Sequence, residues 1–248
     1  MLIDTHCHIH EADYPHEAKE VLSRAQEAGV AEIICIGTNQ KSSEEAVEFA
    51  ESHDNVFAAV GVHPHDAKDG VEGIKKLFGA KKIVAVGEIG LDYYYNNSPR
   101  SIQIAALEQQ LQWAVDYTLP VSFHVRDAFD DFWPIFSNFS GVRGVLHSFT
   151  DTTVNLEKGL ANGLYIGVNG ISTFTRDEAQ RKVFASIPLE RLVLETDAPF
   201  LTPAPYRGKV NEPGRVREVA THQAMLRGVS FDDVASSTSR NAQQLFGL

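Results

Sequence analysis

The chain has 248 residues, of which 43% are hydrophobic and 9% aromatic. It can therefore bury a large core, and its length suits one barrel or two small domains. A formal net charge of −11 argues against a protein that wraps duplex nucleic acid with a broad basic surface, because such binding relies on many Lys and Arg side chains that displace counterions.

The start of the chain and its cysteine content bear on the cellular compartment. Asp4 and His6 interrupt the first apolar run almost at once and no basic region precedes it, so no signal peptide is predicted. Cys7 and Cys35 are too few for a disulfide framework or a cysteine-rich zinc site, which favours a reducing, cytoplasmic location. No apolar run approaches the roughly 20 residues that span a bilayer, so no membrane association is expected.

Short apolar runs rich in β-branched residues alternate with segments of helical periodicity. Eight such runs predict strands at residues 2–5, 32–37, 56–62, 83–87, 120–124, 144–148, 164–168 and 191–196. Strands that alternate with helices imply right-handed crossovers and a parallel sheet. Eight units in about 250 residues predict an α/β fold of the (β/α)8 TIM barrel type, and a doubly wound open sheet is the alternative. No linker divides the chain, so a single domain over residues 1–248 is predicted.

Two intervening segments carry apolar stripes that predict helices. Their stripes consist of Ala18, Val21, Leu22, Ala25 and Ala28, and of Ile104, Leu107, Leu111 and Ala114. Ser42 with Glu45 fits a capping box, and Ser98 before Pro99 fits an N-cap followed by proline at the first helical position. The stretch 213–248 predicts two extra helices after the last strand.

A histidine pair, His6 and His8, ends the first predicted strand. The period of two in a strand places both imidazoles on one face, which is a metal-binding geometry. For an isolated His-x-His, however, two partly exposed structural histidines are the more common outcome.

Further polar side chains stand where other predicted strands end. A histidine or an acid at such a position is often structural on its own. In a (β/α)8 barrel, however, functional side chains come from the C-terminal ends of the strands. The inward-pointing set is therefore expected to lie close together, and it comprises His6, His8, Glu88, His124, His147 and Asp197.

Four imidazoles and two carboxylates form a donor set for divalent metal ions. The set contains too much nitrogen for a calcium cage and suits Zn, Mn, Co or Ni, with Mg also a candidate. Six ligands exceed what one tetrahedral catalytic zinc needs. Two divalent metal ions that share one carboxylate are therefore predicted.

Seven segments match one known family, and they run from the first predicted strand to the loop after the last. They are residues 3–8 (IDTHCH), 61–64 (GVHP), 87–93 (GEIGLDY), 123–126 (FHVR), 146–150 (LHSFT), 194–199 (LETDAP) and 207–213 (RGKVNEP). With these segments the chain resembles the TatD family of metal-dependent deoxyribonucleases, within the amidohydrolase-like barrels. The resemblance implies a (β/α)8 barrel that cleaves phosphodiester bonds in DNA as an exonuclease acting from the 3′ end.

The resemblance also implies roles for the six donors. It assigns His6, His8 and Asp197 to one metal ion, His124 and His147 to the other, and Glu88 to the bridge between them. Two cations about 3.5–4 Å apart activate a water and stabilise charge on the attacking and leaving oxygens. Asp197 is the predicted general base, because it can ligate a metal ion and accept the proton of that water.

Candidate substrate contacts are His63, Arg126, Arg207 and Lys209. His63 either donates a hydrogen bond to a phosphate or orients a neighbouring loop. Arg126 has the fork geometry for a phosphate oxygen, but a salt bridge with Asp127 or another acid is equally open.

Two segments beyond these ligands are open to two interpretations each. Arg207 and Lys209 either anchor a nucleic-acid backbone, or Arg207 merely pins the loop by pairing with Glu212. Residues 93–95 are all tyrosine, and they either stack on a nucleobase or form a packed loop cluster. Glu195 is expected to point inward as a hydrogen-bond partner for a ligand.

The expected partner is DNA or another phosphodiester at the barrel mouth. The alternative substrate is a small ester, lactone or amide, or an aminoacyl ester of tRNA, because the same metal chemistry serves many scissile bonds. A metal-binding scaffold without catalysis does not need a water-activating pair of ions, which makes it the weakest interpretation.

Overall fold

The computed structural model describes residues 1–248, and its sheet has eight parallel strands in chain order. The strands are β1 Leu2–Cys7, β2 Val30–Ile36, β3 Val56–Val60, β4 Ile83–Asp92, β5 Val121–Arg126, β6 Gly144–Leu146, β7 Tyr165–Val168 and β8 Leu192–Leu194. A doubly wound sheet reverses its strand order at a switch point, whereas this order does not reverse. The predicted (β/α)8 fold class is therefore confirmed.

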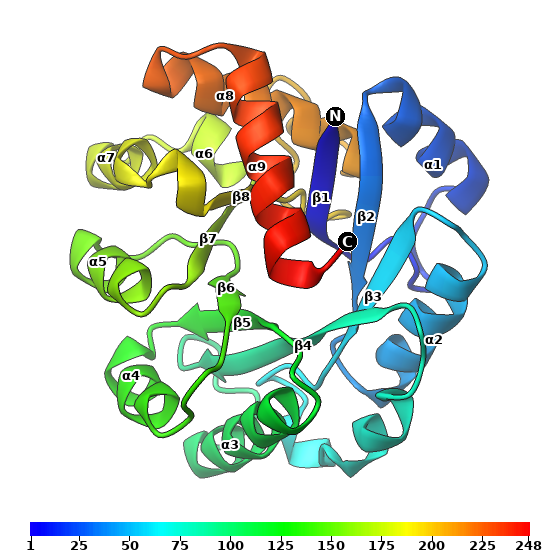
Figure 1. Ribbon diagram of the computed structural model, residues 1–248, viewed down its shortest axis with the longest axis vertical. Helices are drawn as coiled ribbons and strands as arrows, with labels where there is room; N and C mark the ends of the chain where they lie inside the picture. Colours follow the sequence, from blue (N-terminus) through cyan, green and yellow to red (C-terminus); the bar gives the residue numbers. More distant parts are fainter. The chain divides into compact units, whose positions relative to one another are not determined.

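Helices alternate with these strands (Figure 1). The α-helices are α1 Ala18–Glu27, α2 Gln40–Glu51, α3 Arg100–Asp116, α4 Phe129–Ser137, α5 Thr153–Ala161, α6 Ile171–Phe174, α7 Glu178–Ser186, α8 Val216–Arg227 and α9 Phe231–Phe246. Short 3₁₀ turns supplement them at η1 Ala67–Asp69, η2 Glu72–Leu77, η3 Leu189–Arg191 and η4 Pro213–Arg215. None of the helices combines the length and the apolar character that a bilayer crossing requires.

The backbone divides into two compact units. The first unit comprises residues 1–35 and 148–248, and the second comprises residues 36–147. In the first unit, β1 pairs with β2 and β7 pairs with β8, each in parallel. In the second, β3, β4, β5 and β6 pair in that order. A single domain over residues 1–248 stays a prediction.

In the first unit, the two helices predicted after the last strand are present as α8 and α9. Both pack against β1 and β8. Asn241 on α9 donates hydrogen bonds to the carbonyls of Leu189 and Leu192, and the Ser239 hydroxyl donates to the carbonyl of Met1. These carbonyls lie at the beginnings of β8 and β1, so α9 covers the ends of these strands that are remote from His6 and His8.

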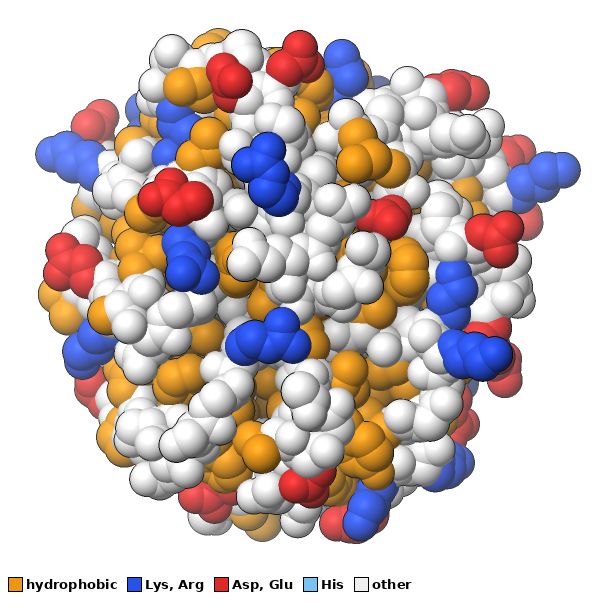
Figure 2. All heavy atoms as spheres, in the orientation of Figure 1, with side chains coloured by type: hydrophobic (Ala, Val, Ile, Leu, Met, Phe, Trp, Pro, Cys, Tyr) orange, Lys and Arg blue, Asp and Glu red, His pale blue; other side chains and the backbone are white.

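In the second unit, an aromatic cluster fixes α4 against β5. The Phe123 ring on β5 lies 5.1 Å from the ring of Phe132 and 5.8 Å from that of Phe136. All three side chains are buried, and each buried side chain of this size stabilises the fold by about 1.5–3 kcal/mol. On the face drawn in Figure 2, basic and acidic side chains are interspersed and no broad basic area forms.

Both predicted helix caps are wrong. The N-cap of α2 is Asn39, whose side chain accepts from the backbone N–H of Ser42 at 3.0 Å. Ser42 therefore lies inside the first turn. Pro99 is the N-cap of α3 and offers no side-chain cap, while the Ser98 hydroxyl donates to the carbonyl of His65 at 2.8 Å. At α2 another residue, Asn39, provides the cap, and at α3 the Ser98 hydroxyl is bonded to His65 and does not cap the helix.

Strand β4 is longer than predicted, because its pairing continues past the polar Glu88 as far as Asp92. Gly90, at φ +154°, makes this possible, since a Cβ there would collide with the carbonyl oxygen of His124. In this register Gly90 lies opposite His124, and Asp92 lies opposite Arg126. The extension therefore brings a carboxylate, Asp92, to the end of β5.

Candidate metal centre

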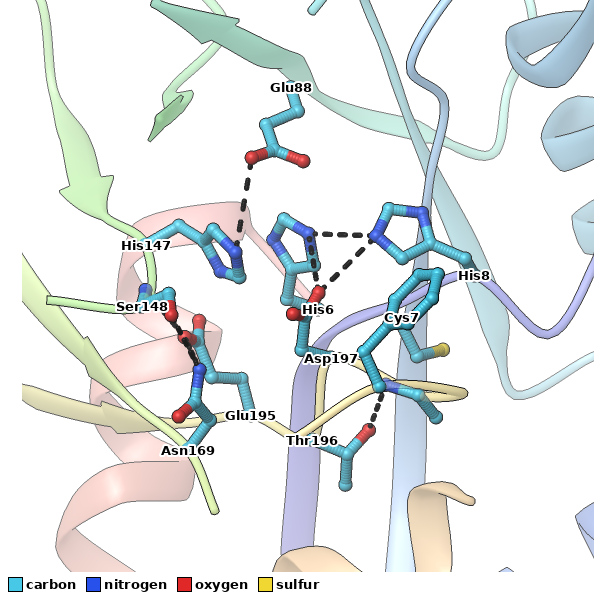
Figure 3. A network of polar contacts seen from close by, with 12 residues as sticks. His6, Cys7, His8, Glu88, His147, Ser148, Asn169, Glu195, Thr196 and Asp197 are labelled. Atoms are coloured by element: carbon cyan, nitrogen blue, oxygen red, sulfur yellow. Dashed lines mark hydrogen bonds and ion pairs between the residues drawn. The ribbon is translucent and has the colours of Figure 1, made fainter. Parts of the chain in front are cut away.

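In the first unit, His6, His8 and Asp197 form a triad of donor atoms (Figure 3). The Nε2 atoms of the two histidines lie 3.3 Å apart. Asp197 Oδ1 lies 3.4 Å from His8 Nε2 and 3.7 Å from His6 Nε2. His6 and His8 are buried, and the Asp197 side chain is 15% exposed. The two imidazoles thus converge on one face, as their spacing predicts, and both are directed at a carboxylate.

The backbone between β8 and η4 holds this triad in place. The N–H of Asp197 donates to the carbonyl of His6 at 2.8 Å, and the N–H of His8 donates to the carbonyl of Ala198 at 2.7 Å. These bonds continue the sheet pairing of β1 beyond the end of β8. Asp197 has φ +59°, a left-handed conformation that is costly outside glycine and that turns its carboxylate toward the two histidines.

Behind the triad, Asp4 joins β1 to Thr196. Its carboxylate accepts from the Thr196 N–H at 2.8 Å and from the Thr196 hydroxyl at 2.6 Å. Burial, opposed by these hydrogen bonds, raises the pKa of Asp4 to about 8. The buried amide of Asn211 in turn donates to the carbonyls of Thr196 and Phe200. Both sides of the triad are therefore held by buried hydrogen bonds, and Asp4 has a structural role although it was not a predicted site residue.

In the second unit, Glu88 on β4 is the common neighbour of three histidines. Its Oε1 lies 2.8 Å from His124 Nδ1, 3.7 Å from His63 Nε2 and 3.9 Å from His147 Nε2. Glu88 is 4% exposed. His63, Glu88 and His124 form a second potential metal triad, with donor atoms within 4.8 Å of one another. His63, predicted as a substrate contact, thus lies beside the proposed metal ligands.

Asp92 and His65 also belong to this cluster, although neither was a predicted site residue. Asp92 Oδ2 lies 3.0 Å from His124 Nε2 and 3.0 Å from His65 Nε2. Its Oδ1 accepts from the backbone N–H groups of Tyr94 and Tyr95, each at 3.0 Å. Asp92 is fully buried. The signal for it lay in the segment Gly-Leu-Asp-Tyr, where an acid directly follows apolar strand residues.

The pKa values in this cluster shift in opposite directions. Burial lowers the pKa of His63 well below its usual value, and the nearby His124 adds to the effect. For His124 burial also acts to lower the pKa, but the hydrogen bonds to Asp92 and Glu88 prevail and raise it. Burial acts to raise the pKa of Asp92, but hydrogen bonds from His124, Tyr95 and His65 hold it below its usual value. The hydrogen bond between Asp92 and His124 therefore favours the charged form of both groups.

The donor atoms fit divalent metal ions. Zn–N bonds of 2.0–2.1 Å place adjacent ligand atoms of a tetrahedron about 3.3–3.4 Å apart, which agrees with the 3.3 and 3.4 Å separations around His8 in the first triad. Metal-binding histidines usually donate their second ring N–H to a carboxylate. His124 has this arrangement, because Nδ1 faces Glu88 while Nε2 faces Asp92.

Two further predicted substrate contacts, Arg207 and Lys209, lie in the loop between β8 and η4. Arg207 donates to the carbonyl of Thr202 at 2.6 Å and stacks on Phe174 at 3.7 Å. It does not pair with Glu212, whose partner at 2.7 Å is Arg24. Lys209 is exposed, and its Nζ lies 5.7 Å from the ring centroid of Tyr206. Substrate contacts by Arg207 and Lys209 stay predictions.

Glu195 supports a loop in the first unit (Figure 3). Its Oε1 accepts from the backbone N–H of Ser148 at 2.7 Å, and the Asn169 amide bonds the Ser148 hydroxyl at 2.8 Å. Gly167 leaves room for this carboxylate, because a Cβ there would lie 2.5 Å from Glu195 Oε2. Glu195 therefore fixes the residue that directly follows His147 in the sequence.

Known proteins resemble the chain over its whole length. The family described as TatD related DNase matches residues 3–247. The chain is 38% identical to the uncharacterized metal-dependent hydrolase YabD of Bacillus subtilis, and the match covers all of both chains. It is 35% identical to the 3′-5′ ssDNA/RNA exonuclease TatD of Erwinia amylovora, again over all of both chains. A crystal structure of a TatD homologue from Escherichia coli K12 superposes with a TM-score of 0.93 at 31% identity, covering 100% of this chain and 98% of that one.

Proposed function

Because this chain belongs to the TatD related DNase family, it is a metal-dependent hydrolase, and we propose that it removes nucleotides from the 3′ end of single-stranded DNA. The observation that carries the proposal is the pair of histidine–carboxylate triads, one in each unit, at the C-terminal ends of strands. In addition, a relative that matches over the full length is named a 3′-5′ ssDNA/RNA exonuclease.

We assign two divalent metal ions to one centre. His6, His8 and Asp197 hold the first, His124 and His147 hold the second, and Glu88 is shared. The (β/α)8 fold supports this assignment, because it brings the C-terminal ends of its strands to one face. The proximity of Glu88 to His124 and His147 supports it as well.

Bound divalent cations supply Lewis acidity, which acidifies a water and stabilises the charge that develops around phosphorus. The protein side chains then provide orientation and proton transfer. Asp197 is the carboxylate of the first triad, and its exposed edge accepts the proton of the attacking water. Its left-handed backbone and the hydrogen bond to His6 fix the direction of that carboxylate.

The proposal is tested with metal-loaded protein and 3′-end- and 5′-end-labelled single-stranded DNA, alongside a panel of small esters, lactones and aminoacyl-tRNA. We expect a 5′-labelled strand to shorten stepwise and a 3′ label to be released at once as a mononucleotide. Both reactions should stop when a chelator is added. Turnover of the ester panel without shortening of either strand would replace the nuclease proposal with the small-ester alternative.

Asp197→Asn tests the proton transfer. We expect turnover of DNA to fall by a factor of roughly 10²–10⁴, because an amide cannot accept the proton. The pH profile of kcat for any residual activity should lose its acidic limb. Metal content is measured on the same samples by mass spectrometry, to separate loss of the base from loss of the metal. Full metal occupancy together with wild-type turnover would show that another group accepts the proton.

A further inference from the structure

A pair of exposed tyrosines and one arginine adjoin the second triad. We propose that Tyr94, Tyr95 and Arg126 form a nucleotide subsite, in which an unpaired base stacks on the tyrosines and its phosphate binds the guanidinium. This inference rests on the proposed function, because it describes how the proposed metal centre binds a single-stranded substrate.

The two tyrosine rings are unusually accessible. Tyr94 is 59% exposed and Tyr95 is 54% exposed. The rings lie edge to face with centroids 4.8 Å apart. Neither hydroxyl makes a hydrogen bond, whereas the neighbouring Tyr93 donates its hydroxyl to Asp131 at 2.7 Å. Tyr93 is thus anchored in the fold, while Tyr94 and Tyr95 present their rings to solvent.

Arg126 carries a charge that the protein itself does not neutralise. Its guanidinium carbon lies 4.1 Å from the ring centroid of Tyr94 and 4.9 Å from that of Tyr95. It forms no ion pair with Asp127 or any other acid, so the salt-bridge interpretation of Arg126 is wrong. Stacking covers the face of the guanidinium and leaves its N–H edge free, and that edge matches the oxygens of a phosphate.

The backbone under this subsite is held rigidly. Asp92 accepts from the N–H groups of both Tyr94 and Tyr95, and the Gln103 side chain binds the N–H and the carbonyl of Asp92. Because Asp92 also contacts His124, one buried carboxylate fixes both the tyrosine pair and a metal ligand.

The register places the subsite next to the centre. Gly90 pairs with His124, and Asp92 pairs with Arg126 two residues further along the same strands. A rise of about 3.3 Å per residue puts the backbone of Arg126 about 7 Å beyond that of His124. A strand that reaches the metal ligands with one phosphate therefore meets Arg126 with another nearby.

The exposed tyrosine rings and the single guanidinium indicate which class of ligand the subsite binds. Stacking on an exposed tyrosine requires a base whose face is free, which a single strand offers at every nucleotide and a blunt duplex does not. One cation, Arg126, over the two exposed rings of a chain of net charge −11 suits one or two phosphates rather than a broad polyanion.

The test measures binding of metal-loaded protein to a fluorescent phosphorothioate single strand by anisotropy at several salt concentrations. Tyr94→Ala is expected to weaken binding roughly 5- to 150-fold with an unchanged salt slope, and Tyr94→Phe to restore it. Arg126→Ala should reduce the slope of log K against log salt by about 0.7, the value for one phosphate contact on a single strand. A strand that is abasic at the stacked position should bind the wild type weakly and be insensitive to Tyr94→Ala.

Tyr117→Ala and Arg143→Ala are the matched controls, because both residues are exposed and lie before β5 and β6, at the opposite strand ends. If Tyr94→Ala and Arg126→Ala bound the strand as tightly as these controls do, the proposed subsite would be wrong. Metal content of every variant is measured by mass spectrometry and should equal that of the wild type, so that a loss of strand binding is not a loss of metal. Tyrosine-dependent binding without DNA cleavage would refute only the proposed function, and cleavage with tyrosine-independent binding would refute only the subsite.

Discussion

Glu88→Gln is expected to lower turnover by on the order of a thousandfold or more, because metal ions contribute several kcal/mol to stabilisation of the transition state. Glutamine has almost the same shape as glutamate, but its neutral amide cannot serve two cations as a shared carboxylate does. Glu88 is buried next to three histidines, so solvent screens its charge little and the loss of that charge is felt in full. Metal content per chain and kcat on single-stranded DNA are measured together, and both should fall.

Glu45→Gln is the matched control, because Glu45 lies on α2 in the same unit and pairs only with Lys41 at the surface. That variant should keep wild-type metal content and turnover. A Glu88→Gln protein that holds two metal ions as tightly as the wild type would remove Glu88 from the bridge. In that case His63, 3.7 Å from Glu88, becomes the next ligand to test by substitution.

The ligands on strand ends could be predicted because their signal is local. His6 and His8 follow an apolar run, and the period of two of a strand places them on one face whatever the rest of the chain does. Their contact with Asp197 is not local, since 189 residues separate His8 from Asp197. It was predicted only through the rule that strand ends of a (β/α)8 barrel gather, together with the family resemblance.

Asp92 and His65 escaped prediction for a physical reason. The apolar run of β4 ends at Gly87, so a pattern of hydrophobic residues cannot show that pairing continues to Asp92. That continuation depends on β5 lying against Gly90, which is a tertiary contact. His65 is in a loop after β3, and only the folded backbone brings it within 3.0 Å of Asp92. The cap of α2 was missed because Asn39 and Ser42 are both good cap residues, and the sequence pattern does not show which of them begins the helix.

Asp92→Asn should therefore have a large effect although Asp92 is not a proposed metal ligand. Hydrogen bonds to charged groups contribute about 1.5–3 kcal/mol each, and Asp92 makes such bonds with His124 and His65. We expect the variant to lose about 3–6 kcal/mol of unfolding free energy in the metal-free state, the sum of the two bonds, measured by denaturant titration. The affinity for the second metal ion should fall about 10- to 100-fold, as for other carboxylates behind a metal-binding histidine.

The pH dependence separates this positioning role of Asp92 from simple packing. The pKa of Asp92 is lowered from its ordinary 3.8, so its contribution to stability is present above that pH and is lost as the pH falls through the lower folded value. The pKa of His124 is raised from its ordinary 6.5, so its contribution is present below that pH and is lost as the pH rises through the higher folded value. The difference in unfolding free energy between wild type and Asp92→Asn should thus be largest between about pH 4 and 6.5 and should become smaller in alkaline solution. Asp131→Asn is the control, because it disturbs the bond from the Tyr93 hydroxyl. Its loss of unfolding free energy should not change between about pH 6.5 and 9. If the loss caused by Asp92→Asn were equally constant over that range, Asp92 would act through packing alone.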